Sequence, residues 1–228
     1  MRKYLLLLLL ICSVPAFAAE REPPRYLDPE LISPELLVPP AKEKTKAWDI
    51  EILMTSIEQK RASERDKEAM KVEQKASVEM VTTRLQDGFD AARYPKTFEL
   101  LHHAFNDTAV VTDNAKKFWG IKRPYQIDPK QVKLLVDPIT NPAYPSGHTS
   151  ISYVLAEILG ILVPDKRAEL RQRAISIAKH RIQAGVHSPQ DIEGGKRLGA
   201  IVLGAMLQNS DFQKDLAAAK EELKNFGK

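Results

Sequence analysis

The spacing of apolar residues over 148–162 constrains this chain more than any other feature. Apolar side chains recur there at Ile151, Val154, Leu155, Ile158, Leu159 and Leu162. This period places them on one side of a helix, which must be buried against other elements. Helical patterns also fill 48–93, 97–122, the stretch up to Ala184 and 210–225, and we find no convincing strand alternation. We therefore expect an all-α, single-domain helical bundle.

Helix boundaries are marked by residues that commonly start and stop helices. Asp165, after a proline, is a candidate cap for the helix that reaches Ala184. Gly185 ends that helix, since glycine readily adopts the left-handed conformation that closes many helices. Ser188-Pro189 opens the next helix, with serine at the cap and proline in the first helical position. Before these helices, 125–145 is a loop interrupted by prolines.

The first residues have the three parts of a secretory signal peptide, which we place at 1–18. Arg2 and Lys3 form a positive start, Leu5–Ile11 an apolar stretch, and Ala16–Ala18 a small-x-small cleavage site. The apolar stretch is too short to span a bilayer comfortably, and no later stretch is long enough. We therefore expect a secreted protein without stable membrane insertion after cleavage; an uncleaved anchor is the alternative.

Removal of 1–18 would also remove Cys12, the only cysteine. The mature chain would then have no disulfide, and its stability would have to come from a packed core. We divide it into a proline-rich N-terminal arm at 19–47, which lies extended on the domain or is partly disordered, and a helical domain at 48–228. The many charged helix formers in 48–93 predict a solvated helical face.

The charge of the chain gives no argument for a nucleic-acid partner. The formal net charge is +4, and it falls to +2 if Arg2 and Lys3 leave with the signal peptide. Basic and acidic residues are interspersed along the sequence rather than gathered in a basic block. We therefore expect no nucleic-acid binding.

Three patches between positions 116 and 191 carry the residues with chemical potential. They are Lys116 with Arg123-Pro124, then Pro145-Ser146-Gly147-His148, then Arg181 with His187 and Asp191. Together they supply cationic side chains, imidazoles, a hydroxyl, a glycine and a carboxylate. A site that binds a phosphoryl group and transfers it to a histidine needs this set.

In the first patch, Lys116 and Arg123 are separated by seven positions. Because this is about two helical turns, both are expected to face one ligand from one helix face, with Pro124 ending the segment. The second patch lies where a loop ends and an apolar helix begins. Free N–H groups at a helix start attract anions, and Gly147 would let a ligand approach the backbone while Ser146 adds a donor. An ordinary cap at Ser146 is the alternative, and this patch taken alone favours it.

In the third patch, Arg181 continues the stripe formed by Leu170, Ala174 and Ile177, which places a guanidinium toward the core. A buried arginine needs an anionic partner, which is either a core carboxylate or a bound phosphate.

His187 and Asp191 are one helical turn apart. If they meet, the carboxylate accepts the proton of one imidazole nitrogen and leaves the other free to attack. The alternative is a surface histidine beside an acid that answers the helix dipole. No metal or other cofactor is expected, because the mature chain lacks cysteine and His102-His103 lacks the i,i+4 spacing of two ligands on one helix face.

In this order and spacing, the three patches resemble the signature of the type 2 phosphatidic-acid phosphatase superfamily, which includes bacterial acid phosphatases and vanadium haloperoxidases. The likeness is greatest to the class A nonspecific acid phosphatases, which are secreted bacterial enzymes, and it covers roughly 112–200. It implies the helical bundle of that superfamily, small phosphate esters as substrates and a periplasmic or secreted location. It also implies a homodimer or larger homo-oligomer, since many relatives form one.

Carried over position by position, the resemblance implies a role for each matching residue. Three cationic side chains would bind the phosphate oxygens, namely Lys116, Arg123 and Arg181. Ser146 and the backbone of Gly147 would add hydrogen bonds. His187 would be the nucleophile, Asp191 would orient it, and His148 would protonate the leaving group. The expected reaction is metal-independent hydrolysis of phosphate monoesters through a phosphohistidine.

Two departures from the family pattern distinguish this chain. The family usually has serine before the third-patch arginine, where this chain has His180, and Ser188-Pro189 replaces a commoner aromatic-containing version. The first bears on the geometry and pH response around Arg181, and the second on substrate preference.

Three alternatives stand beside the acid phosphatase. A vanadate-dependent haloperoxidase would use the same pocket, although the chain is short for one. A soluble lipid-phosphate phosphatase would take lipid substrates without membrane helices. An inactive helical binding protein would need none of the chemistry, yet every position that the chemistry requires is present.

Overall fold

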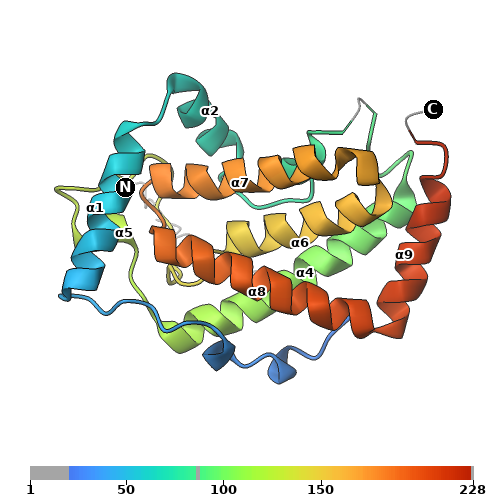
Figure 1. Cartoon of the computed structure of the whole chain (residues 1–228), viewed down its shortest axis with the longest axis horizontal. Coiled ribbons are helices and arrows are strands. Elements are labelled where there is room, and N and C mark those ends of the chain that lie inside the picture. The colour runs from blue at the N-terminus through green and yellow to red at the C-terminus, as the bar shows by residue number, and fades with distance from the viewer. Residues whose placement is uncertain (1–20, 86–87, 227–228) are drawn as a thin grey trace, which may run out of the picture.

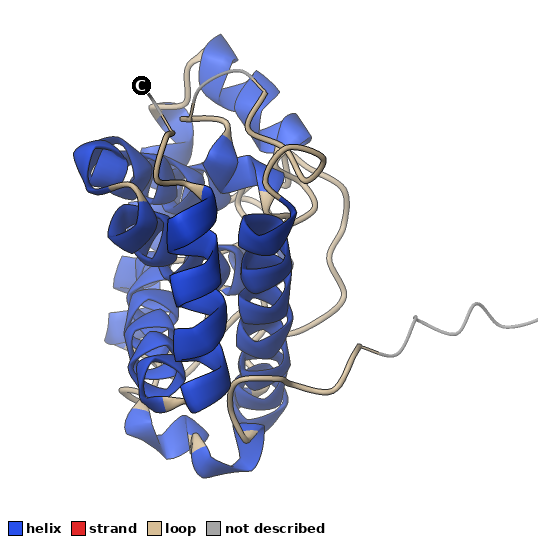
Figure 2. Ribbon diagram, turned by 90° about the vertical axis from the view of Figure 1, so that its right-hand side faces the viewer, coloured by secondary structure: helices blue, strands red, loops and turns tan. Residues whose placement is uncertain are grey.

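The computed structural model describes residues 21–85 and 88–226. Every regular element within these residues is helical (Figure 2), so the expected all-α fold is confirmed for the part of the chain that is described. The predicted signal peptide at 1–18 lies outside the described residues.

The centre of the bundle consists of four long helices, α4 (Pro95–Trp119), α6 (Gly147–Leu162), α7 (Arg167–Gln183) and α8 (Pro189–Gln208). Helix α6 lies between α7 and α8 and also packs on α4 (Figure 1). The apolar stripe predicted from the sequence is buried, and Ile158 and Leu159 have no exposed surface. Helix α6 is enclosed on nearly all sides, which is the position expected for the most apolar helix of a bundle.

Shorter helices cover the ends of this bundle, namely α1 (Lys46–Lys60), α2 (Glu64–Val72), α3 (Glu79–Thr82), α5 (Pro124–Ile127) and α9 (Ser210–Glu222). In Figure 1, α1 and α2 lie near the turn between α7 and α8, and α9 lies at the opposite end against α4. The region 48–93 is divided into separate helices because Ser63 starts a new one. Its Oγ accepts from the Asp66 N–H (3.1 Å) while the Asp66 carboxylate accepts from the Ser63 N–H (2.9 Å).

The N-terminal arm is packed on the bundle over its described residues. It contains two short 3₁₀ helices, η1 (Pro29–Leu31) and η2 (Pro34–Leu36). The Asp107 carboxylate on α4 accepts from the backbone N–H groups of Arg25 (2.9 Å) and Tyr26 (2.7 Å). Tyr26 and Leu37 are buried. The arm therefore contributes to the core rather than hanging free of it.

Two predicted helix boundaries are wrong. Asp165 does not cap a helix but lies inside the 3₁₀ helix η3 (Pro164–Lys166), because the preceding proline already occupies the first helical position. The helical stretch expected over 97–122, in one or two pieces, is a single helix that ends at Trp119, where Gly120 adopts the left-handed conformation with φ 61°. The segment after Gly120 is therefore free to turn back toward the bundle.

Glycines permit close contacts at the end of the bundle where α7, α8 and the start of α6 meet. Gly185 closes α7 as predicted, with φ +77°, and a Cβ there would lie 2.2 Å from a backbone carbonyl oxygen. On α8, a Cβ at Gly194 would lie 2.4 Å from a Tyr144 ring carbon. A Cβ at Gly195 would lie 2.7 Å from the Ser146 carbonyl oxygen. Helix α8 thus approaches the loop before α6 more closely than any side chain would allow.

Candidate active site

One cavity of about 210 Å³ is lined by residues from all three predicted patches. Five of the predicted site residues line it, namely Lys116, Arg123, Gly147, His148 and His187. Ser146, Arg181 and Asp191 do not line it and have no exposed surface. Helix α4, the loop before α5, the start of α6 and the turn between α7 and α8 therefore meet at one end of the bundle.

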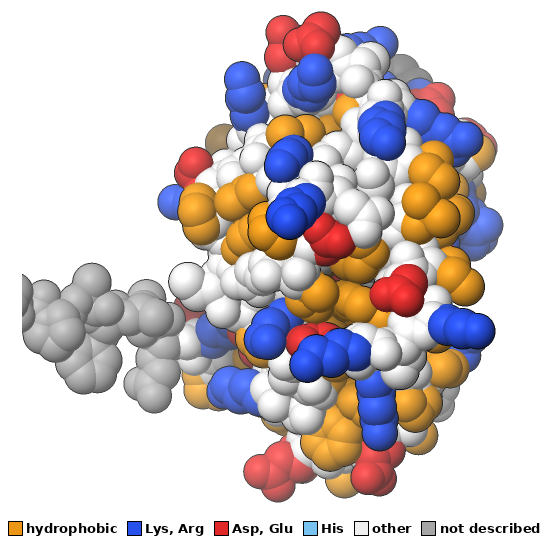
Figure 3. Space-filling model, turned by 90° about the vertical axis from the view of Figure 1, so that its left-hand side faces the viewer, with side chains coloured by type: hydrophobic (Ala, Val, Ile, Leu, Met, Phe, Trp, Pro, Cys, Tyr) orange, Lys and Arg blue, Asp and Glu red, His pale blue; other side chains and the backbone are white. Residues whose placement is uncertain are grey.

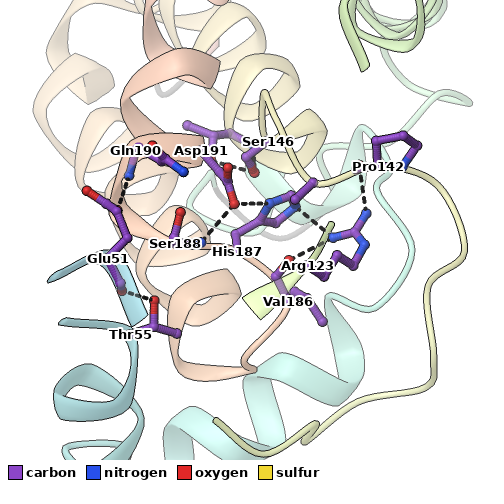
Figure 4. Close-up of polar contacts among 12 residues, drawn as sticks. Glu51, Thr55, Arg123, Pro142, Ser146, Val186, His187, Ser188, Gln190 and Asp191 are labelled. Carbon is purple, nitrogen blue, oxygen red and sulfur yellow. Dashed lines mark hydrogen bonds and ion pairs between the residues drawn. The ribbon is translucent and has the colours of Figure 1, made fainter. Parts of the chain in front are cut away.

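His187 lies between a carboxylate and a guanidinium (Figure 4). Its Nδ1 is 3.3 Å from Asp191 Oδ2, and its Nε2 is 3.2 Å from Arg123 Nη1. A guanidinium can only donate, so Nε2 accepts and Nδ1 carries the hydrogen that it donates to Asp191. Asp191 Oδ2 also accepts from the Ser188 N–H (2.8 Å) at the start of α8. These contacts fix the imidazole tautomer whose lone pair is on Nε2.

Lys116 and Arg123 converge on one loop rather than on one helix face. Lys116 lies in the last turn of α4, whereas Arg123 follows the end of that helix and precedes α5. The Lys116 ammonium donates to the carbonyl oxygens of Pro142 (2.6 Å) and Ala143 (2.9 Å). The Arg123 guanidinium donates to the carbonyl (3.0 Å) and side-chain (2.7 Å) oxygens of Asn141. The predicted shared helix face is wrong because α4 ends between them, yet both cations reach the same cavity.

Arg181 is a buried cation whose guanidinium has no hydrogen-bond partner within residues 21–85 and 88–226. It continues the buried stripe of α7 as predicted and is 0% exposed. None of its three guanidinium nitrogens has a hydrogen-bond partner among the described residues. A buried charged fork without a partner is costly, and a tetrahedral or planar oxyanion is the ligand whose geometry it fits. The sequence left two partners open for Arg181, a core carboxylate and a bound phosphate. No carboxylate among the described residues is hydrogen-bonded to its guanidinium.

Burial sets the protonation of the titratable groups in the site. Burial and the nearby charge of Arg181 lower the pKa of His148 to about 3. Burial likewise holds the pKa of His187 well below its ordinary value and lowers that of Lys116 to about 7. Burial raises the pKa of Asp191 to about 6. Every shift disfavours the charged form, and an anion in the cavity would reverse the shifts of the cationic groups.

The start of α6 combines a helix cap with a histidine that contacts a backbone carbonyl. Ser146 caps the helix, and its Oγ accepts from the N–H (3.4 Å) and the hydroxyl (3.0 Å) of Thr149. The N–H groups of Gly147 and His148 lie in the first turn, where no earlier helix carbonyl can accept from them. His148 Nε2 is 2.9 Å from the carbonyl oxygen of Glu73. Since a carbonyl only accepts, Nε2 carries the hydrogen and Nδ1 is left for a ligand.

Several residues that no motif predicted complete the cavity, namely Arg21, Gln74, Asp113 and Asn141. They lie in the arm, after α2, on α4 and in the loop before α6. Arg21 pairs with Asp113 (2.9 Å). Their residue types are ordinary for solvated segments, so only the position of Asn141, just before the second patch, was a signal that sequence reasoning could have used.

Within residues 21–85 and 88–226, no group of three or more His, Cys, Asp or Glu side chains is arranged to hold a metal ion. No helix in the same residues is both long enough and apolar enough to cross a membrane. On the face shown in Figure 3, basic and acidic side chains alternate with apolar ones rather than forming one basic block.

The sequence profile of the PAP2 superfamily matches residues 102–215. This chain belongs to the PAP2 superfamily. The matched segment contains every site residue that the sequence predicted. The family resemblance seen in the three patches is therefore confirmed.

Two bacterial PAP2 relatives are similar in sequence over part of the chain. An acid phosphatase of Zymomonas mobilis is 31% identical over 144 residues, which cover 59% of this chain and 52% of the relative. A non-specific acid phosphatase of Salmonella typhimurium is 30% identical over 133 residues, which cover 57% of this chain and 53% of the relative. The chain thus spans about half the length of the curated relatives that it matches.

A solved structure shares the fold. The crystal structure of a bacterial vanadium-dependent iodoperoxidase superimposes with a TM-score of 0.58 over 75% of this chain and 52% of the other, at 17% identity. The likeness supports the helical architecture expected from the sequence.

Proposed function

We propose that this PAP2 chain is an acid phosphatase that hydrolyses phosphate monoesters through a phosphohistidine on His187. The buried guanidinium of Arg181 carries the proposal, because its nitrogens have no partner among the described residues. The backbone carbonyl of Arg181 accepts from the His187 N–H (3.3 Å), and the Nδ1 of this histidine is 3.3 Å from Asp191. The relatives named acid phosphatase, from Zymomonas mobilis and Salmonella typhimurium, support the same reaction.

In the first step the Nε2 lone pair of His187 attacks phosphorus while the bond from phosphorus to the ester oxygen breaks. The departing oxygen takes that bond's electron pair and receives a proton from Nδ1 of protonated His148, so that an alcohol leaves. Arg181, Arg123 and Lys116 stabilise the charge on the other three oxygens. The Arg123 guanidinium contacts Nε2 at 3.2 Å and would turn from this lone pair to the phosphate oxygens when the ester binds.

In the second step His148, now neutral, takes a proton from water, and the water oxygen attacks phosphorus. The bond between His187 and phosphorus breaks, the imidazole recovers its lone pair and inorganic phosphate leaves. Asp191 holds the Nδ1 hydrogen of His187 throughout and stabilises the positive charge of the phosphoimidazole. Side chains supply all the positive charge, so we propose that the reaction needs no metal ion.

The reaction requires a protonated His148, although its pKa is about 3 in the cavity without an anion. A phosphate dianion beside the imidazole favours the charged form and raises this pKa. Lower pH assists the same protonation. We therefore propose an acidic to near-neutral optimum.

The size of the cavity, about 210 Å³, is below that of typical drug-sized sites and suits small phosphate esters. We also propose that residues 1–18 are cleaved and that the mature protein is periplasmic or secreted. N-terminal sequencing of protein from the periplasm and medium would test this. Size-exclusion chromatography with light scattering would test the proposed homodimer or larger homo-oligomer.

The decisive assay is hydrolysis of p-nitrophenyl phosphate by the wild type and by His187→Ala, with and without a chelator. We expect activity in the presence of chelator and a loss of at least about 10³-fold in the variant, because the nucleophile is removed. His102→Ala, an exposed histidine on α4, is the matched control and should keep full activity. Absence of wild-type activity, or its abolition by chelator, would refute the proposal.

A vanadate-dependent haloperoxidase is the second candidate, because an iodoperoxidase shares the fold. Vanadate also resembles the phosphoryl group in the transition state of its transfer. The test is iodide and bromide oxidation with vanadate and hydrogen peroxide. We expect vanadate to inhibit phosphate-ester hydrolysis instead. The cationic side chains of Arg181, Arg123 and Lys116 would bind it as a transition-state analogue. Halide oxidation that depends on vanadate and on His187 would favour the second candidate.

A further inference from the structure

Glu73 at the end of α2 makes two kinds of contact. Its backbone carbonyl contacts His148 in the site, and its side chain forms ion pairs with Arg173 and His180. Its carbonyl oxygen is 2.9 Å from His148 Nε2. This carbonyl belongs to the last turn of a helix, where carbonyl groups have no partner within the helix and accept from elsewhere. The bond decides the tautomer of neutral His148, because Nε2 must carry the hydrogen and Nδ1 then has the lone pair.

The side chain of Glu73 is held from α7. It is 1% exposed, and its carboxylate is 2.6 Å from Arg173 Nη1 and 2.8 Å from His180 Nδ1. The other ring nitrogen of His180 is 3.5 Å from Asp66 Oδ1. Asp66 lies in the first turn of α2, about two helical turns before Glu73. Burial opposes ionisation of Glu73, but His180 and Arg173 together hold its pKa below the ordinary value. The carboxylate is therefore charged and fixed between two helices.

The network depends on the residue that departs from the family pattern. His180 stands where the resemblance implies serine, whose side chain is shorter and carries one hydroxyl rather than two ring nitrogens. Glu73 and Asp66 lie before residue 102, where the match to the PAP2 superfamily begins. Histidine at 180 and a carboxylate at 73 thus form a pair that links the matched part of the chain to a helix outside it.

We propose that Glu73 is a positioning residue for His148, and that His180 and Arg173 hold it in place. By fixing the Glu73 carbonyl, the network would aim His148 Nδ1 at the leaving-group oxygen. The inference rests on the proposed function for its effect on catalysis, whereas the tautomer of His148 is independent of any activity.

The kinetic test compares leaving groups, using kcat/KM for p-nitrophenyl phosphate and for an alkyl phosphate such as glycerol phosphate. The p-nitrophenolate ion leaves without a proton, but an alkoxide needs one, so a misdirected His148 should harm only the second reaction strongly. We expect Glu73→Gln to lower kcat/KM for the alkyl ester about tenfold more than for the aryl ester, a fraction of what general acids contribute. Glu68→Gln, an exposed acid on α2, should leave both values unchanged.

His180 supplies a second pair of variants. His180→Ser should also lower kcat/KM for the alkyl ester more than for the aryl ester, but by a smaller factor than Glu73→Gln. His180→Asn should keep the wild-type ratio of the two kcat/KM values, because its amide N–H can replace Nδ1. Equal losses on both esters in folded Glu73→Gln and His180→Ser would overturn the proposal. If Glu73→Gln does not fold, the His180 pair decides the question by the same ratio.

A measurement without substrate separates this inference from the proposed function. Long-range ¹H–¹⁵N spectra of histidine-labelled wild type should show His148 as the Nε2–H tautomer, and His180→Ser should show a mixture of tautomers. A wild-type Nδ1–H tautomer would overturn the inference even in an active enzyme. A wild type that hydrolyses neither ester would refute the proposed phosphatase, while these spectra would still decide the positioning of His148.

Discussion

The segment that matches the PAP2 superfamily and the segment before it contribute different kinds of contact to one site. The matched residues, 102–215, include every side chain that we expect to touch phosphate. The residues before them contribute contacts that hold site residues in place, such as the Glu73 carbonyl on His148. Reactive groups come from one segment, and part of their orientation comes from the other.

The earlier segment also braces the start of α8. The Glu51 carboxylate on α1 accepts from the Gln190 N–H (2.9 Å), next to Asp191 (Figure 4). The Gln190 side chain accepts from the Ala41 N–H in the arm (2.7 Å). The Tyr144 hydroxyl donates to the Val38 carbonyl (2.6 Å). A cavity that gathers buried cations needs such bracing, because these cations repel one another when no anion is bound.

The largest effect should come from the matched segment. Arg181→Ala removes the unpartnered guanidinium and should lower kcat/KM for phosphate esters by about 10³-fold, the scale of losing a transition-state donor. The fold should persist, since the variant relieves repulsion among buried cations. Steady-state kinetics and circular dichroism would measure both. Arg197→Ala, an exposed arginine on α8, is the control, and a loss below about tenfold for Arg181→Ala would contradict the role that we assign.

The next largest effect should come from the earlier segment and should be on stability. Gln59 on α1 donates to the carbonyls of Lys133 (2.7 Å) and Gln183 (3.0 Å) and accepts from the Lys133 N–H (2.8 Å). Gln59→Ala should lower the free energy of unfolding by about 2 kcal/mol, measured by urea denaturation. The folded fraction should keep its kcat/KM, and exposed Lys60→Ala is the control. A tenfold fall in activity at unchanged stability would show that this segment does more than brace.

Anion binding should depend on pH in a direction that the pKa shifts fix. A bound dianion favours the protonated forms of Lys116, whose pKa is about 7, and His148, whose pKa is about 3. Protonation of Asp191, whose pKa is about 6, removes a negative charge that would repel the anion. All of these effects couple binding to proton uptake and make it tighter in acid. Sulfate keeps its charge between pH 5 and pH 8, so its Kd should be at least about tenfold lower at pH 5, or ~1.4 kcal/mol.

Isothermal titration in buffers of different ionisation enthalpy would measure both the sulfate Kd and the protons taken up. Asp191→Asn should reduce the pH dependence because one of the titrating groups is gone. Equal affinity at both pH values, or proton release on binding, would contradict the electrostatic account of the site.

The smallest effect should come from the rim, where the arm meets the matched segment. Arg21 and Asp113 form an ion pair at 2.9 Å with 46% and 33% of their side chains exposed. Exposed pairs of this kind contribute below about 1 kcal/mol. Arg21→Ala should therefore leave Tm nearly unchanged and alter kcat/KM for small esters by less than about threefold, measured against Lys117→Ala as an exposed control. A tenfold change would mean that the arm contacts substrate directly.

The helices and the reactive side chains could be predicted from the sequence because both leave local patterns. Apolar spacing predicted α6, and Gly185 and Ser188 marked the turn that carries His187. The shared helix face of Lys116 and Arg123 was wrong, because sequence distance cannot show that a glycine at 120 ends the helix between them. Contacts such as Glu73 with His148 left no pattern, since a backbone carbonyl can bind any donor and its residue type carries no signal.

The glycines of α8 have a consequence for how this site can change over evolutionary time. Because Gly194 and Gly195 press α8 directly on Tyr144 and the Ser146 carbonyl, the histidine-bearing turn and the start of α6 form one inseparable block. We expect new substrate ranges to arise at lining positions outside this block, such as Gln74, which follows α2 and is hydrogen-bonded to Asp137 rather than to a catalytic side chain. The architecture thus separates the residues that would carry the proposed reaction from those that would select its substrate.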